Sequence, residues 1–541
     1  MFTHLQHLSI ITLLLLSACS NDTSSEESNT TKTIDIKETN TTNEEPISQN
    51  FDVNISLTLS NSNAQEIAEK SIYSSTQLKA KWINNTKLET SIDHFNLQLS
   101  EVNSTAKKLI IEDINSSLSN YTLTQLKSST AYEVTLIACQ NKQCSTSKKT
   151  ATQTLSTDEE YWQIKGGNNY DDADKVANNT NTKPYARKIP STSESYAGRT
   201  LLYYGPKKST EFADGCYIAV SNADNDTYDN IANFETTIEG TAHGLIGSCA
   251  KDDLTKYTNP VCISTTQAIT LKSGGVRLFF EATTSEDNMK YTRSYSIDSK
   301  DGDVGLDFNS DPLLTLCTPD DYQKGGNCEI KKDIGVIGDT DIHSSYFINA
   351  RQGKIGFPTL DSMAWDESNG TFRVITASDS CGLSDNGLFY STYDGSDWYT
   401  YTQDNCAVPL VKYAHGPVIQ HLGQSRYKLY YEDATPLNDQ EDPNTSSKPF
   451  HLIYANGANT GLEDIVDFDD WESGDKAREV NFVWSDGTLL TTKEESGIGD
   501  HMVYVPSTLE EQYIYVNLGG LDNPDWNKAA SGIGIAKLLN P

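Results

Sequence analysis

Acidic and histidine residues recur at the two ends of short apolar segments in the C-terminal part of the chain. Glu281 and the pair Glu432-Asp433 end two similar runs, whereas Asp361, His415 and the pair Asp500-His501 stand at the beginning of three others. Hydrolysis by general acid–base catalysis needs one carboxyl group held protonated and another held ionised. An imidazole can transfer a proton near neutral pH or bind a metal ion. The types and positions of Asp361, Glu281, Glu432 and His415 therefore make them candidate catalytic residues.

The elements that must position these residues are hairpins that recur five times after residue 190. Their second runs read TLLYYGP, VRLFFEAT, TFRVITAS, YKLYYEDA and YIYVNLGG. Four have an apolar partner just upstream, in QAITLKSGG, DSMAWDESNG, GPVIQHLGQS and HMVYVPSTLEE, and Gly, Asn or charged residues separate the runs as in β-hairpins. A further strand is expected after each pair, in CYIAVS, YTRSYSIDSKDG, GLFYSTYDGSDW, FHLIYANG and GIGIAKLL. Residues 157–541 are thus predicted to form a β-propeller of five blades, with six as the alternative.

Propeller geometry predicts where the candidate residues meet. The first strand of each blade lines the axial channel, and its starting end shares a face with the finishing end of the second strand. Asp361, His415 and Asp500-His501 belong to starting ends, and Glu281 and Glu432-Asp433 to finishing ends. These residues are therefore expected to converge on one end of the channel.

Residues 51–156 are predicted to form a small β-sandwich, so that the whole folded chain is all-β. Alternating apolar residues occur around Trp82 and Phe95. Leu126, Thr130, Tyr132 and Val134 resemble the fibronectin type III pattern, in which the Tyr forms a corner that holds the end of the sheet. Ser128 stands where that family usually has Pro. The resemblance implies a fibronectin type III domain that acts as a spacer.

Three propeller segments resemble the five-bladed glycosidases of the arabinanase and β-xylosidase type, the family 43-like enzymes. In that family one blade supplies an Asp base, the next an Asp that tunes the acid, a third a Glu acid, and a later Gly-x-Gly-His strand holds a central ion or water. LDSMAWDESNGTFRVITAS is similar to the second segment and implies that Asp361 tunes the acid. AHGPVIQHLGQSRYKLYYE is similar to the third and GIGDHMVYVPSTLEEQYIYV to the ion-binding blade, which implies His501 as the metal ligand.

The sequence departs from that pattern at the positions of the acid and the base. His415 stands where the Glu acid belongs, and Thr266 or Gln267 where the Asp base belongs. Glycoside hydrolysis needs two carboxyl groups flanking the scissile bond. One hypothesis is that Glu281 and Glu432, with Asp361, supply these groups, and that His415 protonates a leaving group or binds sugar hydroxyls. The other is that the propeller only binds polysaccharide or oligosaccharide, with Trp365 and Tyr413 as stacking platforms and Asp433 and Asp500 as polar contacts.

A third hypothesis is an adhesion or envelope-assembly protein whose propeller binds a protein partner. The formal net charge of −33, from 42 Lys+Arg against 75 Asp+Glu, disfavours nucleic acid and anionic lipid as ligands. We expect a monomer.

The first 50 residues are predicted to be a signal peptide followed by a tether. An apolar run from Leu8 to Leu16 leads into Leu16-Ser17-Ala18-Cys19, which resembles a bacterial lipoprotein signal peptide of residues 1–19. The resemblance implies lipidation at Cys19, with Ser20 favouring the outer membrane, so that the lipid is the membrane attachment. Residues 20–50 are rich in Ser, Thr, Asn and Glu and are predicted to form a disordered tether.

Cysteine spacing favours disulfides over metal ligands. Short separations suggest the pairs Cys139 with Cys144, Cys317 with Cys328, and Cys381 with Cys406, and two of Cys216, Cys249 and Cys262 pair as well. No Cys-x-x-Cys or local His-Cys cluster has zinc spacing. The acidic stretches Asp224–Asp229 and Asp298–Asp311 offer enough oxygen ligands for Ca²⁺ but lack the EF-hand spacing, so calcium is the one cofactor that the composition leaves open.

Overall fold

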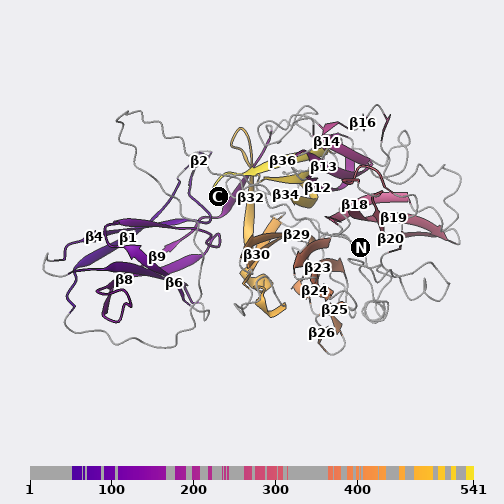
Figure 1. The fold of residues 1–541 in the computed structure, drawn as a ribbon. Helices are drawn as coiled ribbons and strands as arrows, with labels where there is room; N and C mark the ends of the chain where they lie inside the picture. The colour runs from indigo at the N-terminus through magenta and orange to yellow at the C-terminus, as the bar shows by residue number, and fades with distance from the viewer. Residues whose placement is uncertain are drawn as a thin grey trace, which may run out of the picture. The chain divides into compact units, whose positions relative to one another are not determined.

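The computed structural model describes residues 51–165 except residues 64, 68–69, 87–90 and 104–107 (Figure 1). Between residues 177 and 541 it describes strands and short loops, with gaps between them. These residues form strands and two short 3-10 helices, η3 (Phe468–Asp470) and η4 (Gly474–Lys476). Within this part of the chain, no helix has the length and apolarity to cross a membrane. The described chain is all-β, as predicted.

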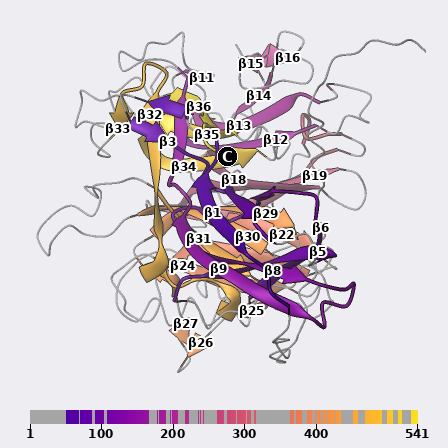
Figure 2. The same cartoon turned by 90° about the vertical axis from the view of Figure 1, so that its left-hand side faces the viewer.

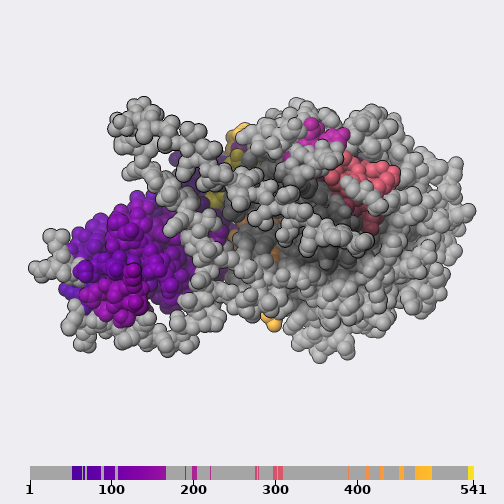
Figure 3. Space-filling model, viewed as in Figure 1, coloured from indigo at the N-terminus to yellow at the C-terminus, as the bar shows by residue number. Residues whose placement is uncertain are grey.

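The N-terminal domain is a sandwich of two antiparallel sheets (Figure 1). Three strands form the sheet β1-β4-β7 and four form the sheet β6-β5-β8-β9. The strand bounds are β1 Ile55–Asn61, β4 Leu78–Asn84, β5 His94–Glu101, β6 Leu109–Asn115, β7 Asn120–Leu123, β8 Ala131–Cys139 and β9 Ser147–Ser156, with a small hairpin of β2 (Gln65–Ile67) and β3 (Lys70–Ile72). In the space-filling view the sandwich is the indigo to violet body (Figure 3).

The predicted tyrosine corner is confirmed. The Lys127 backbone N–H donates to the Tyr132 hydroxyl at 2.8 Å. Tyr132 is buried, and burial raises the pKa of its hydroxyl far above the ordinary value. Trp82 packs edge-on against Phe95, with ring centroids 5.4 Å apart, at the centre of the core between the two sheets. Alternating residues of each strand therefore fill one core, as the apolar alternation predicts.

The residues after the sandwich form five units of antiparallel strands. The first unit is β12 (Thr180–Lys188), β13 (Thr200–Pro206), β14 (Tyr217–Ser221) and β15 (Phe234–Glu235). The second is β18 (Val261–Thr270), β19 (Val276–Glu286), β20 (Met289–Asp298) and β21 (Leu313–Leu314). The third is β22 (Met363–Ser368), β23 (Thr371–Ser378), β24 (Gly387–Tyr393) and β25 (Trp398–Thr400), and β28 (Pro409–Lys412) also pairs with β24.

The fourth unit is β29 (Ala414–Gly423), β30 (Arg426–Asp433), β31 (Phe450–Asn456) and β32 (Arg478–Trp484). The fifth is β34 (Ile498–Val505), β35 (Tyr513–Leu518), β36 (Gly532–Leu538) and β10 (Glu160–Ile164). Short strands flank these units: β11 (Ala177–Asn178), β16 (Thr237–Ile238), β17 (Thr241–Ala242), β26 (Thr402–Gln403), β27 (Cys406–Ala407) and β33 (Leu489–Leu490).

The first strands of the five units close into a ring. β12 lies beside β18, β18 beside β22, β22 beside β29, β29 beside β34, and β34 beside β12 again. This closed order is that of a five-bladed β-propeller, so the prediction of five blades is confirmed. The aromatic-rich runs are the second strands β13, β19, β23, β30 and β35, as expected. For the first run, which has no clear upstream partner in the sequence, the structure supplies β12.

Burial on both faces explains why these second runs are nearly continuous apolar segments. In β30, Tyr427, Leu429 and Tyr431 pack with Leu388 of β24 on one face. Tyr430 packs on the other face in a cluster with Trp162 of β10 and with residues of β32, β35 and β36. A strand enclosed by the neighbouring blades on both sides cannot show the alternation of a half-exposed strand.

The strand directly after the sandwich completes the last blade. β10 pairs antiparallel with β36 and parallel with β32, so it joins the fifth blade to the fourth. The two strands that it joins, β32 and β36, are labelled close together at the upper left of Figure 2. Only three residues separate the end of β9 at Ser156 from the start of β10 at Glu160. The propeller is therefore closed by a strand from the beginning of its own sequence.

The sandwich contacts the propeller through buried polar groups. The Ser128 N–H donates to the Tyr454 hydroxyl at 3.0 Å, and the Ser128 hydroxyl lies 3.1 Å from the same oxygen. The Ser75 N–H donates to the Asn540 carbonyl at 2.8 Å, which ties the end of the chain to the sandwich. Ser128 thus departs from the Pro of the family pattern at the position whose N–H binds the propeller.

We expect Ser128→Pro to lower the free energy of unfolding by about 1–3 kcal/mol, because Pro has no N–H and leaves the buried Tyr454 hydroxyl without that donor. Thermal or urea unfolding of the full chain would measure the loss. Ser128→Ala keeps the N–H and should cost less than Ser128→Pro. Equal losses for the two variants would show that the backbone donor contributes nothing.

A charged network surrounds the same contact. Lys127 lies 2.8 Å from Glu101 of the sandwich and 2.8 Å from Glu472 of the propeller, and Arg478 also binds Glu472. Burial acts to raise the pKa of Glu472, but the hydrogen bond from Arg478 and the positive charges of Lys127 and Arg478 outweigh it, so the pKa lies below its ordinary value of 4.5. The ionised form of Glu472 is therefore the form that stabilises this contact.

The stabilisation from Glu472 is expected to depend on pH. A carboxyl whose pKa is lower in the folded state contributes its full stabilisation above the unfolded-state pKa, here about 4.5, and loses it as the pH falls through the folded-state value. Glu472→Gln should therefore lower the melting temperature at pH 7 and have a progressively smaller effect below pH ~4.5. Melting curves of both proteins from pH 7 to 3 would test this, and a difference that stays constant across that range would contradict it.

The structure confirms one predicted disulfide, Cys139–Cys144. The other predictions are the pairs Cys317–Cys328 and Cys381–Cys406 and one pair among Cys216, Cys249 and Cys262. The side chains of these seven cysteines lie outside the described part of the chain, so these pairs stay predictions.

Candidate functional site

The candidate site lies at the end of the ring where the first strands begin. Register shifts, in which one strand carries extra residues relative to its partner, occur near the start of β12, β18, β29 and β34. The described pairing of β22 with β23 is regular. Bulges are common at the rims of barrels and next to active sites, because they redirect a strand's residues. The irregular backbone of four blades thus gathers at one end of the axis.

The fourth blade places its candidate residues as the sequence predicts. His415 is the second residue of β29, and Glu432 and Asp433 are the last two residues of β30. His415 is the direct cross-strand partner of Glu432, and Ala414 is the partner of Asp433. Directly opposed residues on an antiparallel pair have Cβ atoms about 4.5–5.5 Å apart. His415 and Glu432 therefore occupy one cross-strand position at this end of the blade.

The second blade corrects the expected position of Glu281. The sequence run predicts that Glu281 ends its strand, but β19 continues to Glu286, because its hairpin with β20 stays paired as far as Glu286 and Met289. Glu281 is instead the partner of Ser264, and Thr266 lies within a register shift between Thr265 and Gln267. Ser264, rather than Thr266, therefore corresponds to His415 of the fourth blade.

The fifth blade brings two further candidates beside the fourth. Asp500 and His501 are the third and fourth residues of β34, within the irregular interval between Ile498 and Met502. β34 lies next to β29, the strand that carries His415. The predicted metal ligand and the predicted polar contact therefore belong to the strand adjacent to the His415–Glu432 position.

The remaining candidates are less completely placed. Trp365 is the third residue of β22 and the partner of Val374 in the middle of that hairpin. Asp361, Tyr413 and Cys19 lie outside the described residues. The acid-tuning role of Asp361, the stacking role of Tyr413 and the lipidation of Cys19 stay predictions.

The acidic stretch from Asp298 to Asp311 shows turn chemistry where it is described. One oxygen of Asp303 accepts the backbone N–H groups of Gly305, Leu306 and Asp307 at 2.6–2.9 Å. Asp307 pairs with Lys300 at 2.6 Å. In these described residues the carboxylates are engaged with the chain itself, and the other stretch, residues 224–229, lies outside the described part.

Sequence reasoning missed a buried ionic cluster between the fourth and fifth blades. Lys428 lies 2.6 Å from Glu160 of β10, and Glu160 also accepts hydrogen bonds from Tyr430 at 2.9 Å and Trp162 at 3.1 Å. The Lys428 and Glu160 side chains are 2% and 0% exposed. The one signal was a lysine inside the aromatic run YKLYY. Its burial makes this cluster part of the packing between the blades and not a substrate contact.

Comparison with known proteins supports the N-terminal assignment directly. Residues 69–153 match the fibronectin type III domain model. No curated protein matches the chain.

Several solved structures are similar to the larger part of the chain at low identity. An N-acetylgalactosamine deacetylase from F. plautii is 11% identical, covering 70% of this chain and 94% of its own, with a TM-score of 0.37. A β-1,3-galactosidase of glycoside hydrolase family 43 is 10% identical, covering 65% and 94%, with a TM-score of 0.34. An endo-1,5-α-L-arabinanase from Thermotoga petrophila is 10% identical, covering 65% and 70%, with a TM-score of 0.32.

The strand pairing described above carries the fold assignment for the second domain. Residues 69–153 belong to a fibronectin type III domain, and the strands that follow form a five-bladed β-propeller.

Proposed function

We propose that this protein handles extracellular polysaccharide, which its propeller binds and hydrolyses at the end of the ring where the first strands begin. The observation that carries the proposal is the pairing of His415 with Glu432 at this end, beside the strand that holds Asp500 and His501. Glycoside hydrolysis needs an acid and a base within reach of one bond. Glu432 and His415, on opposed positions, can supply the acid and the base. Glu281 of the second blade is the candidate for a second carboxyl group.

The arrangement departs from that expected of the resembling glycosidases in a specific way. Neither Ser264 nor His415, the residues opposite Glu281 and Glu432, is a carboxylic acid. The carboxyl groups are instead carried by the second strands. We therefore place the reacting carboxyl groups on β19 and β30, with the first strands supplying hydroxyl and imidazole groups that bind sugar hydroxyls or transfer a proton.

A screen of plant, algal and microbial polysaccharides tests the proposal. The full chain should retard in a native gel that contains a responsive polysaccharide and should release reducing ends from it. Retardation without release would leave a binding protein and remove the hydrolytic part. Absence of both across the panel would favour the alternative, a propeller that binds a protein partner.

Attachment of the chain to the outer membrane through a lipid on Cys19 is part of the same proposal. The motif Leu16-Ser17-Ala18-Cys19 supports it. A fatty-acid probe should label the wild-type protein in cells, and equal labelling of Cys19→Ala would contradict the attachment.

A further inference from the structure

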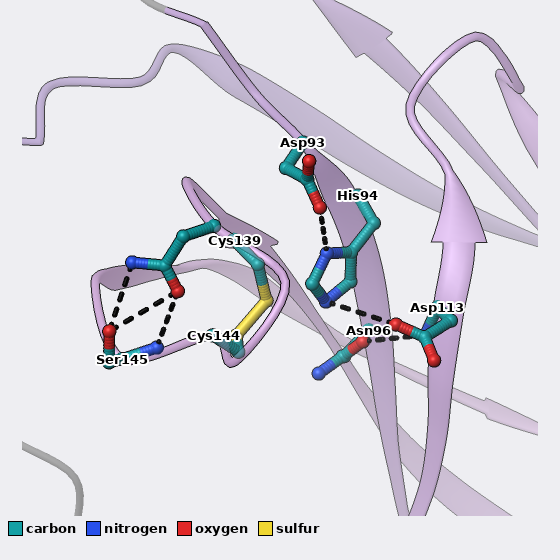
Figure 4. Close-up of a disulfide and its surroundings, with 8 residues drawn as sticks. Asp93, His94, Asn96, Asp113, Cys139, Cys144 and Ser145 are labelled. Atoms are coloured by element: carbon teal, nitrogen blue, oxygen red, sulfur yellow. Dashed lines mark hydrogen bonds and ion pairs between the residues drawn. A yellow bond between two sulfur atoms is a disulfide. The ribbon is translucent and has the colours of Figure 1, made fainter.

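A histidine and two cysteines gather at one end of the four-stranded sheet of the fibronectin type III domain (Figure 4). His94 begins β5 and is the direct partner of Cys139, the last residue of β8. Cys144 follows in the loop and forms the disulfide with Cys139. One ligand atom from each of the three residues lies within 4.8 Å of the other two. Strand pairing thus brings together residues that are 45 positions apart in the chain, which local spacing could not reveal.

The surroundings of His94 orient its ring as in metal-binding histidines. Its Nδ1 lies 2.9 Å from the Asp93 carboxylate, and its Nε2 lies 3.7 Å from Asp113 Oδ1 (Figure 4). In the tautomer with its proton on Nδ1, His94 donates to Asp93, and Nε2, 3.7 Å from Asp113, is then the acceptor atom of the ring. Histidine ligands of metals commonly donate the other ring N–H to a carboxylate in this way. The side chain is 7% exposed, so the surrounding residues hold its position.

The loop that carries Cys144 is held by hydrogen bonds of its own. The Gln140 N–H donates to the Thr146 carbonyl at 2.9 Å, and the Cys144 N–H donates to the Asn141 carbonyl at 2.9 Å. The Asn141 side-chain oxygen accepts the Ser145 N–H at 3.1 Å. These bonds involve the backbone and Asn141, so they do not require the disulfide. The two sulfur atoms are therefore expected to stay close together when the disulfide is opened.

We propose that reduction of the Cys139–Cys144 disulfide creates a Zn²⁺ site formed by the two thiolates and the His94 imidazole, with the fourth position filled by water or by the exposed Asp113 carboxylate beside His94. A reducing dithiol supplies two electrons and two protons, which convert the Cys139–Cys144 bond into two thiols. The reducing dithiol itself is oxidised to a disulfide. Zn²⁺ then displaces the two thiol protons to solvent. In the oxidised form the sulfur atoms are bonded to each other, so this site exists only in the reduced form.

The observed spacing is compatible with zinc coordination. Zn–S bonds are about 2.3 Å and Zn–N bonds about 2.0–2.1 Å, so donor atoms at tetrahedral corners lie about 3.5–3.8 Å apart. The ligand atoms of His94, Cys139 and Cys144 already lie within 4.8 Å of one another. The two thiolates supply negative charge that favours a divalent cation.

Protection of the cysteines from alkylation tests the site. The full chain is reduced with a phosphine, desalted without oxygen, and treated with iodoacetamide with and without one equivalent of Zn²⁺. The peptide that contains Cys139 and Cys144 is then quantified by mass spectrometry. Zn²⁺ should slow its alkylation at least about tenfold, and Asp93→Asn should weaken the apparent Zn²⁺ affinity by about 10–100-fold, because the hydrogen bond between His94 Nδ1 and the Asp93 carboxylate is lost.

Two variants make the test specific to this constellation. His94→Ala should abolish the protection, whereas Gln143→Ala, which changes an exposed loop residue between the cysteines, should leave it intact. Circular dichroism of each oxidised variant verifies the fold. Equal alkylation of the wild-type peptide with and without Zn²⁺ would overturn the proposal, and so would protection that survives His94→Ala.

Discussion

Replacing Lys428 by methionine is expected to lower the free energy of unfolding by about 3–5 kcal/mol. Lys428 and Glu160 form an ion pair at 2.6 Å with both side chains inaccessible to solvent. Methionine fills a similar volume but leaves the Glu160 carboxylate buried without its cation. Tyr430 and Trp162 would continue to donate hydrogen bonds to Glu160, but they supply no positive charge. Chemical denaturation of the full chain would measure the loss.

An exposed ion pair of the same length serves as the control. Lys300 and Asp307 also lie 2.6 Å apart, but their side chains are 57% and 58% exposed. Lys300→Met should therefore cost at most about 1 kcal/mol, because solvent screens such a pair. The double variant Glu160→Gln, Lys428→Met should be more stable than Lys428→Met alone, since it removes the unpaired charge. Similar losses for Lys428→Met and Lys300→Met would show that burial of the pair has no energetic effect.

The Lys428–Glu160 pair lies at the junction between the fourth and fifth blades. Glu160 belongs to β10, the strand that joins the fourth and fifth blades, and Lys428 belongs to β30 in the fourth. The pair thus links the closing strand to the interior of a neighbouring blade. We expect Lys428→Met to open this junction first, which hydrogen exchange would detect as faster exchange of the β10 and β36 amides than of the sandwich core.

Glu432→Gln is expected to lower the release of reducing ends from a responsive polysaccharide at least about a hundredfold, the low end of what a positioned acid or base contributes. The amide keeps the size and the hydrogen-bonding capacity of the side chain but can neither donate nor accept the catalytic proton. Binding of the polysaccharide should change much less than turnover. Reducing-end assays and affinity electrophoresis on the same samples separate the two effects.

Glu367→Gln is the matched control, because Glu367 lies near the other end of a first strand, one residue before β22 ends at Ser368. Turnover by this variant should equal that of the wild type. His415→Asn should also lower turnover. If the two opposed residues act on the same bond, the effect of the double variant His415→Asn, Glu432→Gln should differ from the sum of the two single effects. Unchanged turnover in Glu432→Gln would exclude this carboxyl group from the mechanism.

Much of the fold was predictable because local patterns carry it. The aromatic-rich runs are second strands, since a strand buried on both faces must be apolar along its length. The Leu126, Thr130 and Tyr132 pattern predicted a tyrosine corner, and the hydrogen bond from Lys127 confirms it. His415 and Glu432 could be placed at strand ends because only two residues connect β29 to β30 and the apolar runs end where the strands end.

Other features depended on contacts that no local pattern encodes. Glu281 was misplaced because the length of a hairpin is set by the pairing of its two strands, and β19 and β20 stay paired well past the apolar run. The partner of Lys428 lies 268 positions away, on a strand that closes the ring. The neighbours of His94 likewise come from β6, from β8 and from the loop after β8.

The sequence by itself determined an all-β chain, a propeller of five or six blades, the corner of the sandwich and the residue types available at the blade ends, because hydrophobic periodicity and turn residues act over a few positions. The tertiary structure alone decided that β10 closes the propeller, that Ser128 binds Tyr454 across the two domains, and that His94 meets Cys139 and Cys144. These contacts join residues far apart in the chain. Their geometry follows from how whole sheets pack and pair, which is a property of the folded molecule.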